Sequence, residues 1–213
     1  MSMTGERVLV LAPHTDDAEL GSGGTIARWA AEGADIRIVA FSAAEASVPE
    51  GLPADINRTD AVSAAALLGI DAERVEVLDL PVRNFPEHRQ RILDLIIRLR
   101  AAIEPTIVIG PCSTDRHQDH EVIHQEMMRA FARVTVLGYE LPWNMTTFSS
   151  TVHIEIGDED LEAKAASLAA YRSQAHRSYL SGEYLRSWAV TRGIQCGKDL
   201  AEGFELMHWT VGR

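Results

Sequence analysis

Cysteine is scarce in this chain of 213 residues, because Cys112 and Cys196 are its only two. Two thiols cannot form a disulfide framework or a cysteine-rich zinc site. A long apolar run is missing as well, since no stretch approaches the roughly 18 residues of a membrane-spanning helix. The start, MSMTGERVLVLAP, lacks the charged and apolar regions of a signal peptide. We therefore expect a cytoplasmic protein with no transmembrane segment.

Positive charge is also in short supply. Lysine and arginine number 20 against 31 aspartates and glutamates, which gives a formal net charge of −11. This balance argues against a nucleic-acid partner and against binding to an anionic membrane. The chain shows no repeat, linker or low-complexity tract. Since domains usually span about 100–200 residues, we expect residues 1–213 to form one domain with a sizeable core.

Strand-like and helical segments alternate along the chain. Val/Ile/Leu runs predict strands that are buried on both faces, at 7–12, 36–42, 74–80, 106–111, 135–141 and 152–156. Helical patterns lie at 24–33, 57–69, 88–103, 119–134, 159–175 and 182–193. This alternation predicts an α/β protein with a mostly parallel, doubly wound sheet and helices on both of its faces. Residues 43–58 are the most loop-like stretch and would form a flap after the second strand.

Polar residues crowd behind the first and the fourth predicted strands. In the common strand order 3-2-1-4-5, the carboxyl ends of these two strands flank the ligand-binding crevice of an open α/β sheet. APHTDDAELGSGG follows the first strand, and PCSTDRHQDHEVIH follows the fourth. We therefore expect both segments to share one site. Between them they hold His14, Asp16, Asp17, Glu19, Asp115, His117, Asp119, His120, Glu121 and His124.

These residue types suit a divalent metal ion. Neutral imidazole and carboxylate bind zinc at about 2.0–2.2 Å, and a catalytic zinc has three protein ligands and an open position for water. His14 and Asp17 are three residues apart, so one turn can direct both inward, and His120 would complete the set. A bound cation would also offset the repulsion between the crowded carboxylates.

Neighbouring residues could then carry the chemistry. Asp16 could take a proton from a water molecule whose pKa the metal has lowered. His117 could donate a hydrogen bond to a developing oxyanion or protonate a leaving amine. Asp119 could orient one of the two ligating histidines. These roles predict a metal-dependent hydrolysis.

APHTDDAELGSGG and DRHQDH resemble two motifs of the PIG-L/LmbE-like family of zinc-dependent N-acetylglucosaminyl de-N-acetylases. The family pattern is roughly A-H-P-D-D-E near the N-terminus and H-x-x-H after the fourth strand of a Rossmann-like sheet. The resemblance implies that His14, Asp17 and His120 hold zinc. It also implies that Asp16 is the general base, and that His117 stabilises the tetrahedral intermediate and handles the leaving-group proton.

The resemblance further implies a substrate, a small-molecule N-acetylated amino sugar or its conjugate, which would release acetate. Zinc is the implied metal, and iron, cobalt or manganese can occupy the same ligand set. A homo-oligomer is compatible with the sequence. Thr15 replaces the usual proline and Ala18 the usual glutamate of the first motif. The resemblance extends over most of the chain through GYELPW at 138–143, YRSQ at 171–174 and AEGFE at 201–205.

Four other interpretations compete with this one. The TDD of residues 15–17, taken alone, is typical of a helix N-terminus. The glycines after the first strand suggest a nucleotide-binding loop, but they do not give G-x-G-x-x-G, and the carboxylates would repel a pyrophosphate. HEVIH at 120–124 would provide His120, His124 and Glu121 as the ligands and base of a metalloprotease. A non-enzymatic α/β binding module is the fourth.

Four further residues lie near the expected site, and each has a default interpretation that involves no function. Trp143 follows the fifth predicted strand and could stack on a sugar ring, because strand-end loops line the sites of α/β proteins; otherwise it belongs to the core or rim. Arg58 and Arg83 could hold a substrate anion, and are otherwise solvated. His124 would pack one helical turn below the site.

Overall fold

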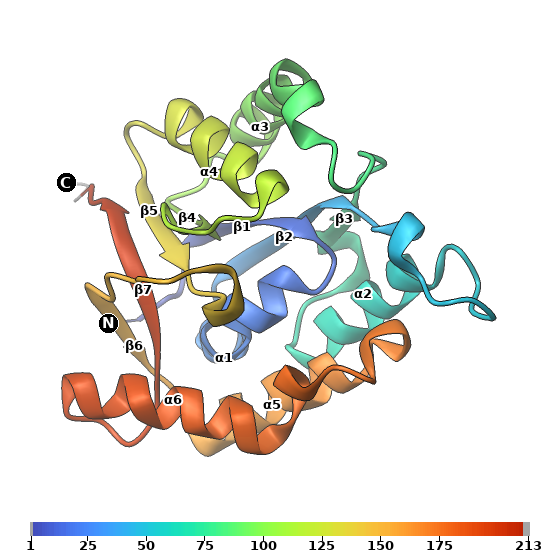
Figure 1. Ribbon diagram of the computed structural model, residues 1–213. Helices are drawn as coiled ribbons and strands as arrows, with labels where there is room; N and C mark the ends of the chain where they lie inside the picture. Colours follow the sequence, from blue (N-terminus) through green and yellow to red (C-terminus); the bar gives the residue numbers. More distant parts are fainter. Residues whose placement is uncertain (1, 211–213) are drawn as a thin grey trace.

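A seven-stranded sheet runs through the protein in the order β3-β2-β1-β4-β5-β7-β6 (Figure 1). The structure is a computed structural model and describes residues 2–210. The strands are β1 (Arg7–His14), β2 (Asp35–Ser42), β3 (Val75–Val77), β4 (Ile107–Pro111), β5 (Thr135–Tyr139), β6 (Val152–Glu155) and β7 (Ala201–His208). The α-helices are α1 (Asp17–Ala31), α2 (Ile56–Leu67), α3 (Arg89–Ile103), α4 (Gln118–Ala130), α5 (Asp158–Ala169) and α6 (Gly182–Cys196).

The common strand order 3-2-1-4-5, which was assumed in placing the expected site, is present in the sheet. β1 is parallel to both β2 and β4, and β4 is parallel to β5. β7 then pairs antiparallel with β5 on one side and with β6 on the other. β7 was not predicted from the sequence, because AEGFELMH carries a glycine and two glutamates in place of a Val/Ile/Leu run. The sheet is therefore mostly parallel with an antiparallel edge.

Several boundaries differ from the predicted ones. α1 begins at Asp17 rather than near Gly24, because acidic residues favour the first turn of a helix. The predicted strand 74–80 is regular only over Val75–Val77. The helix predicted over 159–175 ends at Ala169, and a 3-10 turn follows it.

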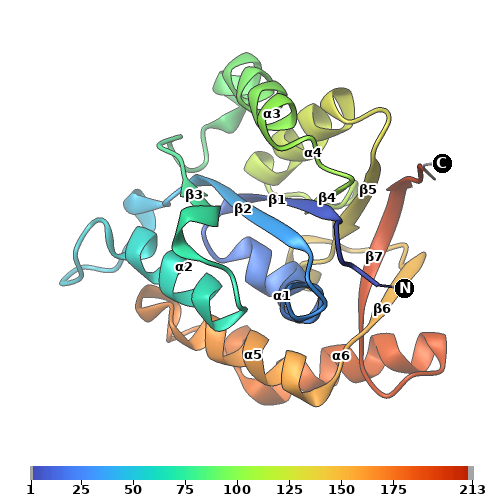
Figure 2. The ribbon, with the colours of Figure 1, turned by 180° about the vertical axis from the view of Figure 1, so that it is seen from behind.

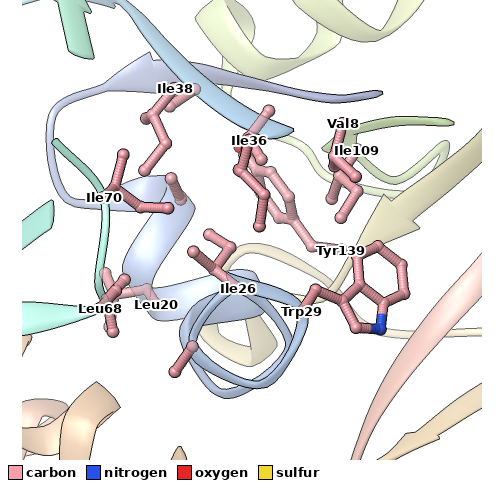
Figure 3. Packing of buried hydrophobic residues seen from close by; sticks show 14 of the residues in the cluster. Val8, Leu20, Ile26, Trp29, Ile36, Ile38, Leu68, Ile70, Ile109 and Tyr139 are labelled. Carbon is pink, nitrogen blue, oxygen red and sulfur yellow. The ribbon is translucent and has the colours of Figure 1, made fainter. Parts of the chain in front are cut away.

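Helices cover both faces of the sheet, as predicted. α3 and α4 lie on one face, and α1, α2, α5 and α6 lie on the other (Figures 1 and 2). β1 is buried on both sides, since Val8 and Val10 belong to the hydrophobic cluster around α1, and Leu9 and Leu11 to the cluster with α3 and α4. Figure 3 shows Ile26 of α1 facing the side chains that project from the sheet. No helix within residues 2–210 is long and apolar enough to cross a bilayer.

α1 is kinked within its glycine-rich part. Ser22 has a non-helical φ of −149°. Gly21 is required beside it, because an added Cβ would lie 2.5 Å from the ring of Tyr139. Glu202 of β7 accepts the backbone N–H groups of residues 24–25 at 3.0 and 2.7 Å. This carboxylate satisfies the donors that the interruption of the helix leaves without a helical partner.

Candidate metal centre

The two polar segments meet at one edge of the sheet. β1 ends at His14 and β4 ends at Pro111, and these two strands are parallel neighbours. α4 then begins at Gln118 and brings a second turn of polar residues to the same edge. His14, His117 and His120 each offer a ring nitrogen, and these atoms all lie within 4.8 Å of one another. The segments expected to share one site do lie together.

Three donor atoms converge most tightly. Asp17 Oδ2 lies 3.1 Å from His14 Nδ1 and 3.2 Å from His120 Nε2. The two ring nitrogens are 3.4 Å apart. Ligands at about 2.0–2.1 Å from a tetrahedral ion are separated by about 3.3 Å, so this triangle has the size that a metal ion requires. All three side chains are buried.

Two carboxylates occupy the outer nitrogens of the same histidines. Asp119 Oδ2 lies 2.9 Å from His14 Nε2, and Asp115 Oδ2 lies 2.8 Å from His120 Nδ1. A carboxylate accepts a hydrogen bond from the ring N–H that it faces, so each neutral imidazole turns its unprotonated nitrogen toward Asp17. Two lone pairs and a carboxylate oxygen thus point into one small space, which is an arrangement that attracts a cation.

Segments distant in sequence hold these carboxylates in place. Asp119 accepts the backbone N–H groups of Arg83 at 2.6 Å and of Phe85 at 3.2 Å. Asp115 accepts the side-chain amide of Asn144 at 3.2 Å. The sequence analysis assigned Asp119 to one of the histidines, and the structure places it on His14. No role was predicted for Asp115, Phe85 or Asn144, and Arg83 was considered only as a partner for a substrate anion. The only signal for Asp115 was its place in the same acidic segment.

The electrostatics of the triangle call for positive charge. Burial lowers the pKa of His14, but the charge of Asp17 and hydrogen bonds with Asp119 and Asp17 outweigh it and raise this pKa to about 9. Burial likewise lowers the pKa of His120, and Asp17 and Asp115 raise it to about 10. Burial acts to raise the pKa of Asp17, yet His120 and His14 hold it well below its usual range. Protons or a divalent cation can supply the charge.

Asp16 directly precedes α1 and is next to Asp17 in the chain. It occupies the N-cap position, but its side chain accepts no capping hydrogen bond, so a capping role does not account for it. Burial and the charge of Asp17 raise the pKa of Asp16 to about 6, although His14 acts to lower it. A carboxyl group whose pKa lies near neutrality is suited to accept a proton during a reaction.

His117 is the N-cap residue of α4, and its side chain accepts a hydrogen bond there. The backbone N–H of Asp119 donates to His117 Nδ1 at 3.2 Å. Because Nδ1 accepts, the neutral ring carries its proton on Nε2. Burial and the nearby His120 and His14 lower the pKa of His117. His117 therefore carries a neutral N–H donor on Nε2, and one of its ring nitrogens lies within 4.8 Å of ring nitrogens of His14 and His120.

The HEVIH segment does not form a zinc site of the metalloprotease kind. His124 Nδ1 lies 3.1 Å from the carbonyl oxygen of Pro111, to which it can donate. Glu121 is exposed and accepts the side-chain amide of Gln125 at 3.1 Å. Within residues 2–210, the histidine group that could hold a metal includes His120 but not His124.

The two candidate anion-binding arginines differ. Arg58 is already engaged, since it pairs with Glu45 and Asp79 and donates to the carbonyl oxygen of Val77 at 2.8 Å. Arg83 is exposed, and its φ of 66° places its backbone in the left-handed region. Such a conformation is costly for a residue with a side chain. Arg83 adopts this conformation at the position where its backbone N–H donates a hydrogen bond to Asp119.

The two departures from the family pattern leave the triangle intact. Thr15 contributes its carbonyl oxygen, which accepts a hydrogen bond from the hydroxyl of Tyr171. Ala18 is fully buried, where it packs in the core cluster around α1. Burial raises the pKa of the neighbouring Glu19 to about 8, so this side chain adds little negative charge at neutral pH.

Comparison with known proteins assigns the chain to a family. The family model PIG-L, described as GlcNAc-PI de-N-acetylase, matches residues 9–131, which include both polar segments. The uncharacterized deacetylase YaiS of Escherichia coli (strain K12) is 28% identical over 176 residues, which are 78% of this chain and 90% of that protein.

Solved structures share the fold over nearly the whole chain. The N,N'-diacetylchitobiose deacetylase from Pyrococcus horikoshii is 24% identical with a TM-score of 0.79, covering 95% of this chain and 86% of that one. GalB, the 4-carboxy-2-hydroxymuconate hydratase from Pseudomonas putida KT2440, is 20% identical with a TM-score of 0.70, covering 98% of each chain. Since these two catalyse different reactions, likeness at this level establishes the fold alone. The family model spans more than half of the chain, and the protein therefore belongs to the PIG-L family of de-N-acetylases, which are hydrolases that act on amides.

Proposed function

We propose that this deacetylase hydrolyses the acetamide group of an N-acetylated amino sugar, or of a conjugate of one, and releases acetate. The observation that carries the proposal is the 3.1–3.4 Å triangle of His14, Asp17 and His120, with Asp16 next to Asp17 in the chain. The family description names GlcNAc, which supports an amino sugar as substrate.

We propose zinc as the metal, held by His14 Nδ1, Asp17 Oδ2 and His120 Nε2. Two nitrogens and one carboxylate oxygen are a donor set that catalytic zinc uses. His117 is the alternative third ligand. The ring nitrogens of His14, His117 and His120 lie within 4.8 Å of one another, whereas the Asp17 oxygen lies within 3.2 Å of the donor nitrogens of both His14 and His120. When bound, such an ion acts as a Lewis acid that polarises the amide carbonyl and lowers the pKa of water.

In this mechanism Asp16 transfers the proton and His117 donates a hydrogen bond. Asp16 takes one proton from water as the water oxygen bonds to the amide carbon. His117 donates a hydrogen bond through Nε2–H to the carbonyl oxygen as negative charge develops on it. Asp16 then gives its proton to the sugar nitrogen as the C–N bond breaks. The products are a free amine and acetic acid, which ionises to acetate.

We also propose the cytoplasm as the place of action. Cys112 is buried and Cys196 is exposed, and both are free thiols. Free thiols persist in a reducing compartment.

The test combines metal analysis with acetate release. We expect the purified protein to hold about one zinc ion per chain, in line with a single three-ligand set. We expect it to release acetate from N-acetylglucosamine or its glycosides, but not from an N-acetylated peptide. A chelator should abolish the activity and added zinc should restore it. Absence of acetate from every sugar, with the metal bound, would reject the proposal.

A further inference from the structure

An aromatic stack lies directly after β5. Trp143 belongs to the 3-10 turn η4 (Pro142–Asn144), and Tyr179 belongs to the 3-10 turn η6 (Ser178–Leu180). Their rings are stacked, with centroids 4.1 Å apart and an angle of 15° between the planes. Trp143 is 37% exposed although it is a large apolar residue, whereas Tyr179 is half-buried. The stack therefore presents the Trp143 indole to the surface.

The stack has a firm support. Trp188 of α6 lies edge-on to Trp143, with centroids 6.5 Å apart. The indole N–H of Trp188 donates to the buried Glu140 at 2.8 Å, and Arg192 Nε donates to the same oxygen at 2.9 Å. Glu140 follows β5 directly, so it ties the helix that carries Trp188 to the end of this strand. An aromatic group held in this way loses little conformational freedom when it binds a ligand.

The stack also lies close to the metal centre. Asn144, the residue after Trp143, donates its amide to Asp115 at 3.2 Å, and Asp115 faces His120 at 2.8 Å. Trp143 is thus next in the chain to the residue whose side chain holds Asp115, the carboxylate that faces the proposed ligand His120. On the Tyr179 side, burial and the charge of Asp16 raise the pKa of the phenol, while Arg177 acts to lower it.

We propose that Trp143 and Tyr179 form a binding subsite for a second ring of the substrate, a sugar ring joined to the acetamido sugar whose amide is cleaved. A sugar ring has an apolar C–H face, and an aromatic ring offers it a large, rigid surface with a negative face. This inference rests on the proposed function, since it extends the same substrate.

Kinetics on two sugars test the subsite. We would measure acetate release from N-acetylglucosamine and from its β-1,4-linked disaccharide, N,N'-diacetylchitobiose. Trp143→Ala should raise KM for the disaccharide about tenfold and leave kcat within about twofold, while kcat/KM for the monosaccharide should stay within about twofold. Trp143→Phe should recover most of the loss. Trp209→Ala, which removes another exposed tryptophan (61% exposed), is the matched control and should change neither sugar.

Two results would overturn the subsite: an equal loss on both sugars, or no loss on the disaccharide. If the wild-type protein hydrolyses neither sugar, the proposed function fails for these two substrates, and binding still tests the subsite. Tryptophan fluorescence titration should then show tighter binding of the disaccharide than of the monosaccharide, with the difference removed by Trp143→Ala. Equal binding of the two sugars, or binding of neither, would reject it.

Discussion

Asp119 Oδ2 lies 2.9 Å from His14 Nε2, although the two residues are 105 positions apart in the chain. The same carboxylate accepts two backbone N–H groups from residues 83–85. Asp119 therefore joins the segment after β4 to the end of β1 and to a third loop. Because it also selects which nitrogen of His14 carries the proton, it prepares the other nitrogen for a cation.

We expect Asp119→Asn to weaken zinc binding about 10–100-fold, because an uncharged amide is a poorer partner for the ligating imidazole. Competition with a chromophoric chelator would measure the change in Kd. Asp199→Asn makes the same chemical change at an exposed position and should leave the affinity unchanged. An unaltered Kd for Asp119→Asn would show that this contact does not tune His14.

Metal binding should release protons. Without a metal ion, the pKa of His14 is about 9 and that of His120 about 10, so both rings are protonated at pH 7. A metal ion must displace these protons, about two for each ion bound, and its affinity should fall as the pH is lowered. Isothermal titration calorimetry at pH 7, in buffers with different heats of ionisation, would count them. Heats that do not depend on the buffer would contradict this proton count.

Asp16→Asn should separate chemistry from metal binding. The amide cannot accept the water proton, so we expect kcat for acetate release to fall about 10²–10⁴-fold. Zinc content should stay at the wild-type level, because Asp16 Oδ atoms are not part of the triangle. Elemental analysis of the same preparation checks this. An active Asp16→Asn enzyme with bound zinc would assign the base to another group.

A pair of histidines on α4 tests which ligand set is used. His120→Ala should lose stoichiometric zinc, because it removes one corner of the triangle. His124→Ala should keep the metal, since His124 lies against the carbonyl oxygen of Pro111. Loss of zinc from His124→Ala, together with inactivation by Glu121→Gln, would revive the metalloprotease interpretation.

The sequence predicted the parts of the molecule that depend on local pattern. The Val/Ile/Leu runs of β1, β2, β4 and β5 were correctly read as strands, because strands buried on both faces have few other compositions. The known crevice of doubly wound sheets then brought His14 and His120 together in the prediction. Both inferences use rules that hold for a whole class of folds.

The parts that escaped prediction depend on contacts between distant segments. The backbone N–H groups that hold Asp119 come from residues 83–85, and nothing in the side chains of that loop signals a donor. Asn144 reaches Asp115 only because η4 folds back toward α4. The inserted strand β7 carries Glu202 at a buried position, which its composition does not indicate, since the partners of that carboxylate lie on α1 and α5.

Glu202 and Lys164 provide a test of stability that is independent of activity. Lys164 Nζ donates to Glu202 Oε1 at 2.6 Å, and both side chains are buried. Removing one partner leaves a buried charge without its counter-ion, so Lys164→Met should lower the free energy of unfolding by about 3–5 kcal/mol. The exposed pair of Lys198 and Glu155, 3.0 Å apart, is the control, and Lys198→Met should cost less than about 1 kcal/mol. Urea unfolding followed by circular dichroism measures both. Glu202→Gln should lose at least as much as Lys164→Met, because the two backbone N–H groups of α1 are accepted by different oxygens of Glu202, and an amide keeps only one acceptor oxygen while it leaves the Lys164 charge unpaired. Equal losses for Lys164→Met and Lys198→Met would show that burial adds nothing to the strength of this pair.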